Sequence, residues 1–333
     1  MKKLFTFFSL LFLCLAAIAQ QDAKQLQETA KEYMRGGDYG NAAILLVKAL
    51  AQAPGDLEIS KDLALDYYFD KDYTRALEII KPLLDRTDVD DQTYQVAGNI
   101  YKGLEQYKEG EAMYKKGLKR FPKSGPLYNE YGELLNSREN PAAINLWEKG
   151  IEMDPIYSGN YYNAAKYYYF TPDKVWSIIY GEIFLNIETL SGRTAEIKTL
   201  LLDSYKKLFA EDVLKDIDGK NKFEKAFLQT MNKQTALAAD GINAESLTMI
   251  RTRFNLDWYE NYASSFPFKL FDYQQQLLRE GIFAAYNQWI FGTAQNLVVY
   301  QNWTSAHPNE YIDFSNFQKG RIFRIPAGQY YHK

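Results

Sequence analysis

The sequence predicts an all-α protein, in which a right-handed solenoid of helical hairpins is followed by an aromatic-rich helical region. Three observations support this fold class. Small and bulky residues recur every 34 positions in the first half of the 333 residues, and such a period is typical of stacked supersecondary units. The second half keeps the hydrophobic spacing of helices without that period. One cysteine and two histidines exclude a disulfide scaffold and a thiolate or histidine-rich metal site.

Residues 1–19 are expected to be a cleaved signal peptide. Two lysines precede an apolar run from 4 to 17, and an Ala-x-Ala pattern predicts cleavage before Gln20. The run is shorter than the roughly 20 residues that cross a bilayer. We therefore expect an exported, periplasmic protein with no membrane span after cleavage, and secretion stays open as an alternative. Cys14 would be removed with the leader.

Five columns of residues hold the 34-residue register. Two columns contain small residues and three contain bulky ones, and the final members of the last two columns come one residue early. The columns are Ala30, Ala64, Gly98 and Gly132; Tyr33, Tyr67, Tyr101 and Leu135; Tyr39, Tyr73 and Tyr107; Ala42, Ala76, Gly110 and Ala143; and Leu50, Leu84, Leu118 and Ile151. Small residues let two helix backbones approach closely, where a larger side chain would overpack at a cost of about 1–3 kcal/mol. A hairpin of this kind cannot bury its apolar face alone, so neighbours stack.

Turn residues separate the two helices of each pair. Gly36-Gly37 joins the first pair, and Pro54-Gly55 ends its second helix. The pattern resembles the tetratricopeptide repeat family, whose unit is a 34-residue helix–turn–helix. The third copy matches it most clearly, at Tyr94, Ala97, Gly98, Tyr101, Tyr107, Tyr114, Gly117 and Pro122. The copies are placed at 23–56, 57–90, 91–124 and 125–155, with a degenerate fifth at 156–190.

The fifth copy departs from the pattern in its second helix. Trp176 stands where a small residue is expected, unless Ser177 takes that place. We predict a separate helical region over 191–333. Its most apolar span, 270–291, is expected to be weakened but not broken by Gly281 and Gly292. Further short helices are predicted at 297–303 and 311–317.

The resemblance implies a groove that is lined by the first helix of each repeat and binds a protein or peptide. The matching positions carry amides, aromatic rings and modest charge, which suit hydrogen bonding to an extended or helical partner. They are Gln27, Lys31, Lys61, Leu65, Tyr68, Gln95, Asn99, Lys102, Asn129, Glu133, Asn136, Tyr162, Lys166 and Tyr169. An equally open reading is that these are simply exposed helix positions.

The sequence contains only weak candidates for a catalytic, metal-binding or nucleic-acid-binding site. Ser305 lies near His307 without the glycines of a nucleophile elbow, and His332 is expected to fray. Asp216 and Asp218 resemble part of a calcium loop that lacks its closing glutamate. Lysines and arginine at 115–123 form a basic cluster on a helix face that should be solvated, and the net charge of −3 argues against nucleic acid. We expect no cofactor, no metal and no catalysis.

Two functional hypotheses of different classes follow. The first is a protein–protein interaction scaffold or adaptor in the cell envelope. The second places a glycan-binding or hydrolytic module in residues 190–333, where aromatic side chains are dense, with the repeats as a targeting arm. A structural component of an envelope complex is a third reading.

Overall fold

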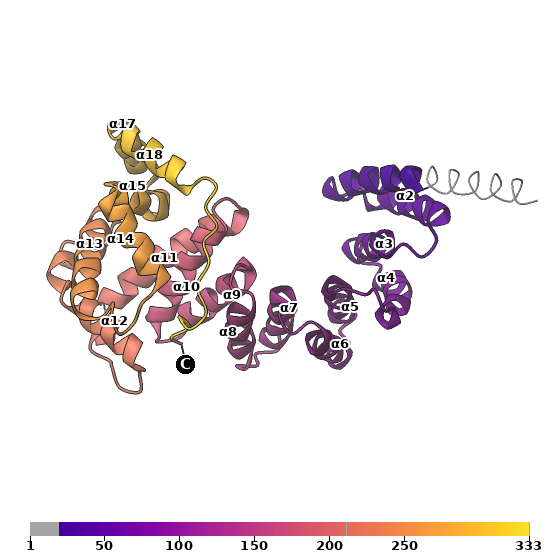
Figure 1. The fold of residues 1–333 in the computed structure, drawn as a ribbon, viewed down its shortest axis with the longest axis horizontal. Coiled ribbons are helices and arrows are strands. Elements are labelled where there is room, and N and C mark those ends of the chain that lie inside the picture. The colour runs from indigo at the N-terminus through magenta and orange to yellow at the C-terminus, as the bar shows by residue number, and fades with distance from the viewer. Residues whose placement is uncertain (1–19, 211, 333) are drawn as a thin grey trace, which may run out of the picture. The chain divides into compact units, whose positions relative to one another are not determined.

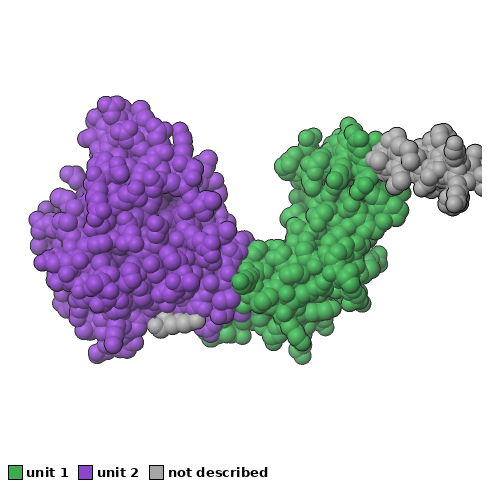
Figure 2. All heavy atoms as spheres, in the orientation of Figure 1, with its two compact units in different colours: residues 1–143 green, residues 144–333 purple. Residues whose placement is uncertain are grey.

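The computed structural model describes residues 20–210 and 212–332, so the predicted leader and its cleavage site lie outside the described residues. Within these ranges every element of regular structure is helical, which confirms the all-α prediction. The chain forms two compact units, divided between residues 143 and 144 (Figure 2). The sequence had predicted a change of organisation at 190. No helix in the described ranges is both long and apolar enough to cross a bilayer.

Unit 1 is built from successive helical hairpins (Figure 1). Its elements are a helix over 20–35, α2 (Tyr39–Gln52), α3 (Leu57–Phe69), α4 (Tyr73–Ile80), the short 3-10 helix η1 (Lys81–Asp85), α5 (Asp91–Gly103), α6 (Tyr107–Arg120) and α7 (Gly125–Asn136). The first helices of copies two to four therefore begin at 57, 91 and 125, as the 34-residue period predicts. The first hairpin and α3 share one core, formed by Ala23, Ala30, Ala42, Leu46, Ala49, Ile59 and Leu63.

Local chemistry repeats along with the packing. The side chains of Asp38, Asp56, Asp72 and Asp90 each accept a hydrogen bond from the backbone N–H three residues later, which fixes where four helices begin. The turn inside each hairpin takes a left-handed residue at the same position. These residues are Gly37, Lys71, Glu105 and Glu139, with φ between 54° and 77°. The capping aspartates and the left-handed turn residues thus both recur at intervals of 34 residues.

Small residues lie where helices approach most closely. Ala30, Ala42 and Ala64 are fully buried. A Cβ on Gly98 of α5 would lie 2.9 Å from Tyr114 Cδ1 of α6 and still closer to two other ring carbons. Tyr114 is itself buried, so the ring has no room to withdraw. The small-residue columns are therefore steric requirements of the hairpin stack.

Unit 2 continues the hairpin order and then departs from it. Its elements are α8 (Ala143–Met153, which begins at the division), α9 (Ser158–Tyr169), α10 (Lys174–Ile187), α11 (Gly192–Ala210), η2 (Asp212–Leu214), α12 (Lys222–Asn232), η3 (Thr235–Ala238), α13 (Ala244–Asn261), α14 (Lys269–Arg279), α15 (Phe283–Asn287), the π-helical η4 (Gln288–Gly292), α16 (Thr293–Gln295), α17 (Leu297–Ala306) and α18 (Pro308–Gln318). Helix α11 begins 34 residues after α9. The hairpin spacing thus extends one helix beyond the predicted repeats.

Helix α10 is the centre of unit 2, because it is buried from Lys174 to Asn186. Ser177 occupies the position of close approach, with its Oγ 2.9 Å from Ser204 Oγ of α11. Trp176 points elsewhere, and its Nε1–H donates to Glu224 of α12 over 2.9 Å. Ser177 therefore fills the small-residue place in the fifth hairpin.

A buried ion pair joins α10 to the helices that follow. The Arg251 guanidinium of α13 pairs with Glu182 of α10, and the same carboxylate accepts from Gln274 over 2.7 Å and from the Tyr286 hydroxyl over 2.8 Å. Arg251 also donates to Asn287 of α15. A buried charge is tolerated only when it is paired and hydrogen-bonded, so this network fixes how α10, α13, α14 and α15 pack.

Two expectations about unit 2 are wrong. Gly281 does break the span 270–291, because its φ of 73° reverses the chain between α14 and α15. His332 does not fray: its side chain is 2% exposed and packs against aromatic rings of α10. The expected helices near 297–303 and 311–317 lie within α17 and α18.

Replacing Gly98 by alanine should lower the free energy of unfolding by about 1–3 kcal/mol, because the added methyl group overlaps the buried Tyr114 ring. The matched control is Gly40→Ala in α2, where a Cβ meets no atom within 4 Å; it should stabilise by up to about 1 kcal/mol. Urea melts of both variants check this, and equal effects would contradict the packing argument.

Candidate functional site

In unit 1 the predicted groove side chains link each first helix to the next. Gln27 donates to Asp62 of α3 over 2.5 Å, and the Lys31 ammonium lies 3.4 Å from the same carboxylate. The Asp62 carboxylate thus interacts with both predicted groove residues of the helix over 20–35. Because these partners lie 31 and 35 residues apart, the contacts cross from one repeat to the next.

Lys61 is not available to a partner. Its side chain is 2% exposed, it pairs with Asp90, and it lies 2.7 Å from Glu58. Gln92 accepts a further hydrogen bond from it over 3.1 Å. These contacts outweigh the burial of the ammonium and hold the Lys61 pKa above its ordinary value. Lys61 therefore contributes to the packing of α3 against the start of α5.

The predicted residues of the third and fourth copies converge on two glutamates. Gln95 donates to Glu130 over 3.2 Å, and the Lys102 ammonium lies 3.6 Å from Glu130 and 3.7 Å from Glu133. Asn99, which lies between them on α5, accepts a hydrogen bond from the Tyr114 hydroxyl over 2.6 Å, and its amide helps to lower the pKa of Glu130. We call Gln95, Asn99, Lys102, Glu130 and Glu133 the Glu130 cluster.

Burial is the main cause that raises the pKa of Glu130, and the neighbouring Glu133 carboxylate adds to it, while Lys102 opposes both. Within the cluster two carboxylates face one ammonium. Glu130 was not among the predicted groove residues, although it lies one position from the predicted Asn129. The cluster can accept hydrogen bonds from a cationic or amide-bearing group.

Other predicted residues border this cluster. Asn129 donates to Glu133 over 3.2 Å but is largely buried. The Tyr68 ring packs against Tyr73, with 5.7 Å between centroids, and its pKa is raised by burial and then by the charge of Glu130. Leu65 is half-buried and Asn136 is exposed. The contacts therefore connect four of the predicted residues of copies three and four, with Tyr68 near them: Gln95, Lys102, Asn129 and Glu133.

The predicted residues of the fifth copy lie in unit 2 and contact α11. Tyr162 donates to Glu196 over 2.5 Å, and Lys166 pairs with the same carboxylate over 2.7 Å. Tyr169 donates to Asp203, and the Lys207 ammonium lies 3.9 Å from the Tyr169 ring centre. These side chains are thus engaged with the next helix, as Gln27 and Lys31 are in unit 1.

Sequence reasoning missed Asp66, a buried carboxylate on α3. It is 1% exposed, and neither oxygen has a hydrogen-bond partner among the residues that the structure describes. The equivalent positions 34 and 68 residues later hold the buried Ile100 and Leu134. A carboxylate at a position that is apolar in the next two copies was the signal that could have found it. Burial, with Asp70 and Asp38 nearby, raises its pKa to about 7.

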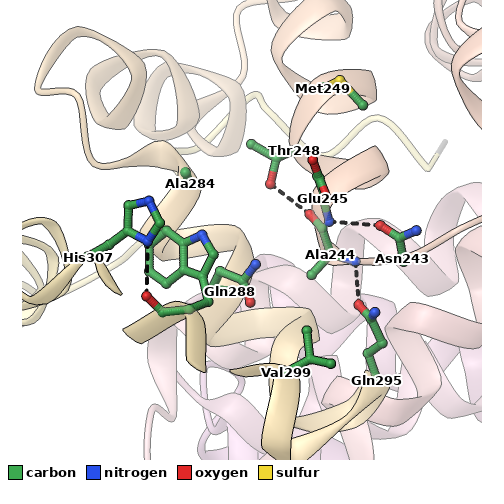
Figure 3. A pocket seen from close by; sticks show the side chains of 11 residues that line it. Asn243, Ala244, Glu245, Thr248, Met249, Ala284, Gln288, Gln295, Val299 and His307 are labelled. Atoms are coloured by element: carbon green, nitrogen blue, oxygen red, sulfur yellow. Dashed lines mark hydrogen bonds between the residues drawn. The ribbon is translucent and has the colours of Figure 1, made fainter. Parts of the chain in front are cut away.

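Unit 2 contains a pocket of about 470 Å³ between the start of α13 and the end of α17 (Figure 3). Its lining residues are Asn243, Ala244, Glu245, Thr248, Met249, Ala284, Gln288, Gln295, Val299, Trp303 and His307. The Trp303 and His307 rings stack with 4.4 Å between centroids, and Gln295 accepts from the Ala244 N–H over 2.7 Å. Gln288, from the π-helical turn, is largely buried, and its Oε1 has no partner in the described part of the chain.

The described side chains include no group of three or more histidine, cysteine, aspartate or glutamate residues that could hold a metal ion. Asp216 and Asp218 are exposed on a turn. Candidate features for binding thus include the polar contacts between successive helices, the Glu130 cluster and the pocket of unit 2.

The repeated unit identifies the fold of the hairpins. Hairpins follow one another at 34 residues, with a small residue at each close approach and polar contacts between successive first helices. This is the tetratricopeptide-repeat fold.

Solved structures align with these tetratricopeptide repeats. A thermophilic TPR protein of Thermus thermophilus is 17% identical over 54% of this chain and 99% of its own, with a TM-score of 0.47. PilF of Pseudomonas aeruginosa is 16% identical over 63% and 98%, also at 0.47. A tetratricopeptide repeat protein from Parabacteroides merdae is 14% identical over 72% and 92%, at 0.41. No family model and no curated protein matches the sequence.

Asp66 makes the stability of the tetratricopeptide repeats depend on pH. The pKa of Asp66 is about 7 in the folded chain, whereas its ordinary value, which applies to the unfolded chain, is 3.8. Ionisation of the carboxyl therefore disfavours folding, and the free energy of unfolding falls as the pH rises from about 4 to 7. Asp66→Asn should therefore stabilise the chain at pH 8, by a few kcal/mol at most, because the neutral amide avoids the cost of ionising a buried carboxylate. At pH 4, where the carboxyl is protonated in the folded chain, the effect should be much smaller.

Chemical denaturation at the two pH values checks this. The control is Asp85→Asn, because the Asp85 side chain is 88% exposed and should change stability little at either pH. A destabilised Asp66→Asn chain at pH 8 would show that the carboxylate has a favourable partner.

Proposed function

We propose that the protein is a non-enzymatic scaffold that binds a protein or peptide partner through the first-helix face of unit 1. The observation that carries this is the Glu130 cluster, where residues from two repeats converge. A repeat array offers this kind of surface because successive first helices present side chains at a regular spacing.

The charge of the cluster defines the chemistry of the partner. Two carboxylates share one partly exposed ammonium, which lies 3.6 and 3.7 Å from them, so one positive charge faces two negative charges. An arginine or lysine side chain could replace Lys102 beside the carboxylates, while Gln95 and Asn99 hydrogen-bond to a peptide backbone. Tyr68, at the border, offers an aromatic surface. The proposed partner is a basic peptide segment.

Export to the cell envelope is part of the proposal. It rests on the pattern of residues 1–19, a short cationic start, an apolar run and an Ala-x-Ala site. A mature chain without cysteine needs no redox partner to fold in an oxidising compartment. A fusion of residues 1–25 to a reporter that is active only after export tests this part independently of binding.

The scaffold proposal is tested with a random peptide library selected on the full chain. Selected peptides should be rich in arginine and lysine. The double variant Glu130→Gln/Glu133→Gln should bind them about tenfold more weakly by calorimetry, which corresponds to the roughly 1.4 kcal/mol expected for charge-assisted hydrogen bonds. Lys102→Ala should leave binding unchanged or strengthen it, because it removes a competing cation.

The matched control is Glu139→Gln, an exposed glutamate on the turn of the fourth copy, which should bind like the wild type. Selection of acidic peptides, or equal binding by the double variant and the control, would overturn the assignment of the Glu130 cluster.

A second candidate function is the binding of a saccharide in the pocket of unit 2. Tryptophan and amide side chains are the groups that recognise sugar faces and hydroxyls, and Trp303, Gln288 and Gln295 line this pocket. We expect Trp303→Ala to lose at least tenfold in retention on a glycan array. Ile312→Ala, an exposed apolar residue of α18, is the control, and absence of retention by the wild type would remove this candidate.

A further inference from the structure

Residues 319–332 follow α18 without regular secondary structure (Figure 1) and pack along unit 2. Lys319, Gly320, Arg321 and Ile322 are exposed, and the Ile322 side chain shows 85% of its surface. Beyond them Phe323 and Ile325 are buried. Four solvent-exposed residues thus connect α18 to the rest of the segment, which packs on unit 2 again from Phe323 onward.

Tyr331 is bound through both its ring and its main chain. The ring stacks on Phe223 of α12, with 4.6 Å between centroids and 12° between planes. Its edges meet Phe266 and Phe268, and its hydroxyl donates to the Pro267 carbonyl over 2.8 Å. Asn221 donates to the Tyr331 carbonyl over 2.7 Å. A stacked ring with satisfied polar ends is how aromatic anchors bind at interfaces.

His332 is bound beside it. Its ring meets Trp176 and Tyr180 of α10 edge-on, at centroid distances of 6.0 and 6.2 Å. Its Nε2 lies 3.4 Å from Glu152 and 3.9 Å from Glu148 of α8. A further contact fixes the approach of the segment, since the Lys269 N–H donates to the Gln329 side chain over 2.7 Å. We call Trp176, Tyr180, Phe223, Phe266 and Phe268 the aromatic site.

We propose that the aromatic site is a peptide-recognition site for an extended Tyr-His segment. Its occupant in this structure is the 319–332 segment of the same chain, and its occupant in trans is the same segment of a second copy. The recognition uses side chains and main chain of a segment with no helix of its own, as in peptide binding. Exchange of an identical element between copies needs no new interface chemistry. Residues 319–322 are exposed and can serve as the hinge, although Arg321 lies 3.6 Å from the Phe317 ring centre of α18 and donates to Gln276 of α14 over 3.3 Å.

The experiment uses the full chain and a fluorescein-labelled peptide of residues 319–332, which stands for the segment of a second copy. In the wild type the attached segment competes at an effective concentration of about millimolar, so peptide binding is weak. In the full-length Tyr331→Ala chain this competitor loses its anchor. We expect the peptide to bind that variant at least tenfold more tightly, by fluorescence anisotropy.

The control chain is Lys319→Ala, at an exposed position outside the site, which should bind like the wild type. A peptide with alanine at the position of Tyr331 should not bind any chain. Circular dichroism checks that Tyr331→Ala is folded; if it is not, His332→Ala opens the site by its second anchor. No binding to any folded variant, or equal binding to all chains, would overturn the proposal.

Discussion

The close approach of two helices at a small residue is the constraint on which the tetratricopeptide repeats depend. Gly98 gives Tyr114 of the paired helix room against the backbone of α5. The ring then extends far enough for its hydroxyl to donate to Asn99 over 2.6 Å. The Asn99 amide in turn helps to lower the pKa of Glu130 in the next repeat. A steric requirement inside one hairpin thus orients a polar side chain on the surface that we assign to partner binding.

Two buried carboxylates, Glu182 and Asp66, differ in whether other side chains pair with them. Glu182 in unit 2 is paired with Arg251 and accepts from Gln274 and Tyr286, so its burial is compensated and holds four helices in one arrangement. Asp66 in unit 1 is equally buried without any such partner in the described residues. The first arrangement holds the helices of unit 2 together, whereas we expect the second to lower the free energy of unfolding above neutral pH.

Periodicity predicted the repeats because the contacts within and between hairpins recur at a fixed spacing. The starts of α3, α5 and α7 could be read from the sequence for this reason. The burial of Lys61 by Asp90 and the docking of His332 on α10 could not, because both depend on which surfaces meet after folding. The prediction that Gly281 would not break the span 270–291 was wrong for a local reason. Hydrophobic spacing does not reveal that a single glycine takes a positive φ.

The strength of each polar contact indicates which part of the first-helix face can exchange partners. Lys61 is enclosed by three acceptors, so opening its contacts would leave a buried charge at a cost of about 3–5 kcal/mol. The Lys102 side chain is a quarter exposed, and its ammonium lies beyond 3.5 Å from both glutamates, so its ion pairs are weaker than those of Lys61. A partner can therefore displace the contacts of Lys102 at a lower cost than those of Lys61. Binding on this face is therefore expected at the Glu130 cluster, and the contact of Lys61 with Asp90 acts as a fixed part of the scaffold.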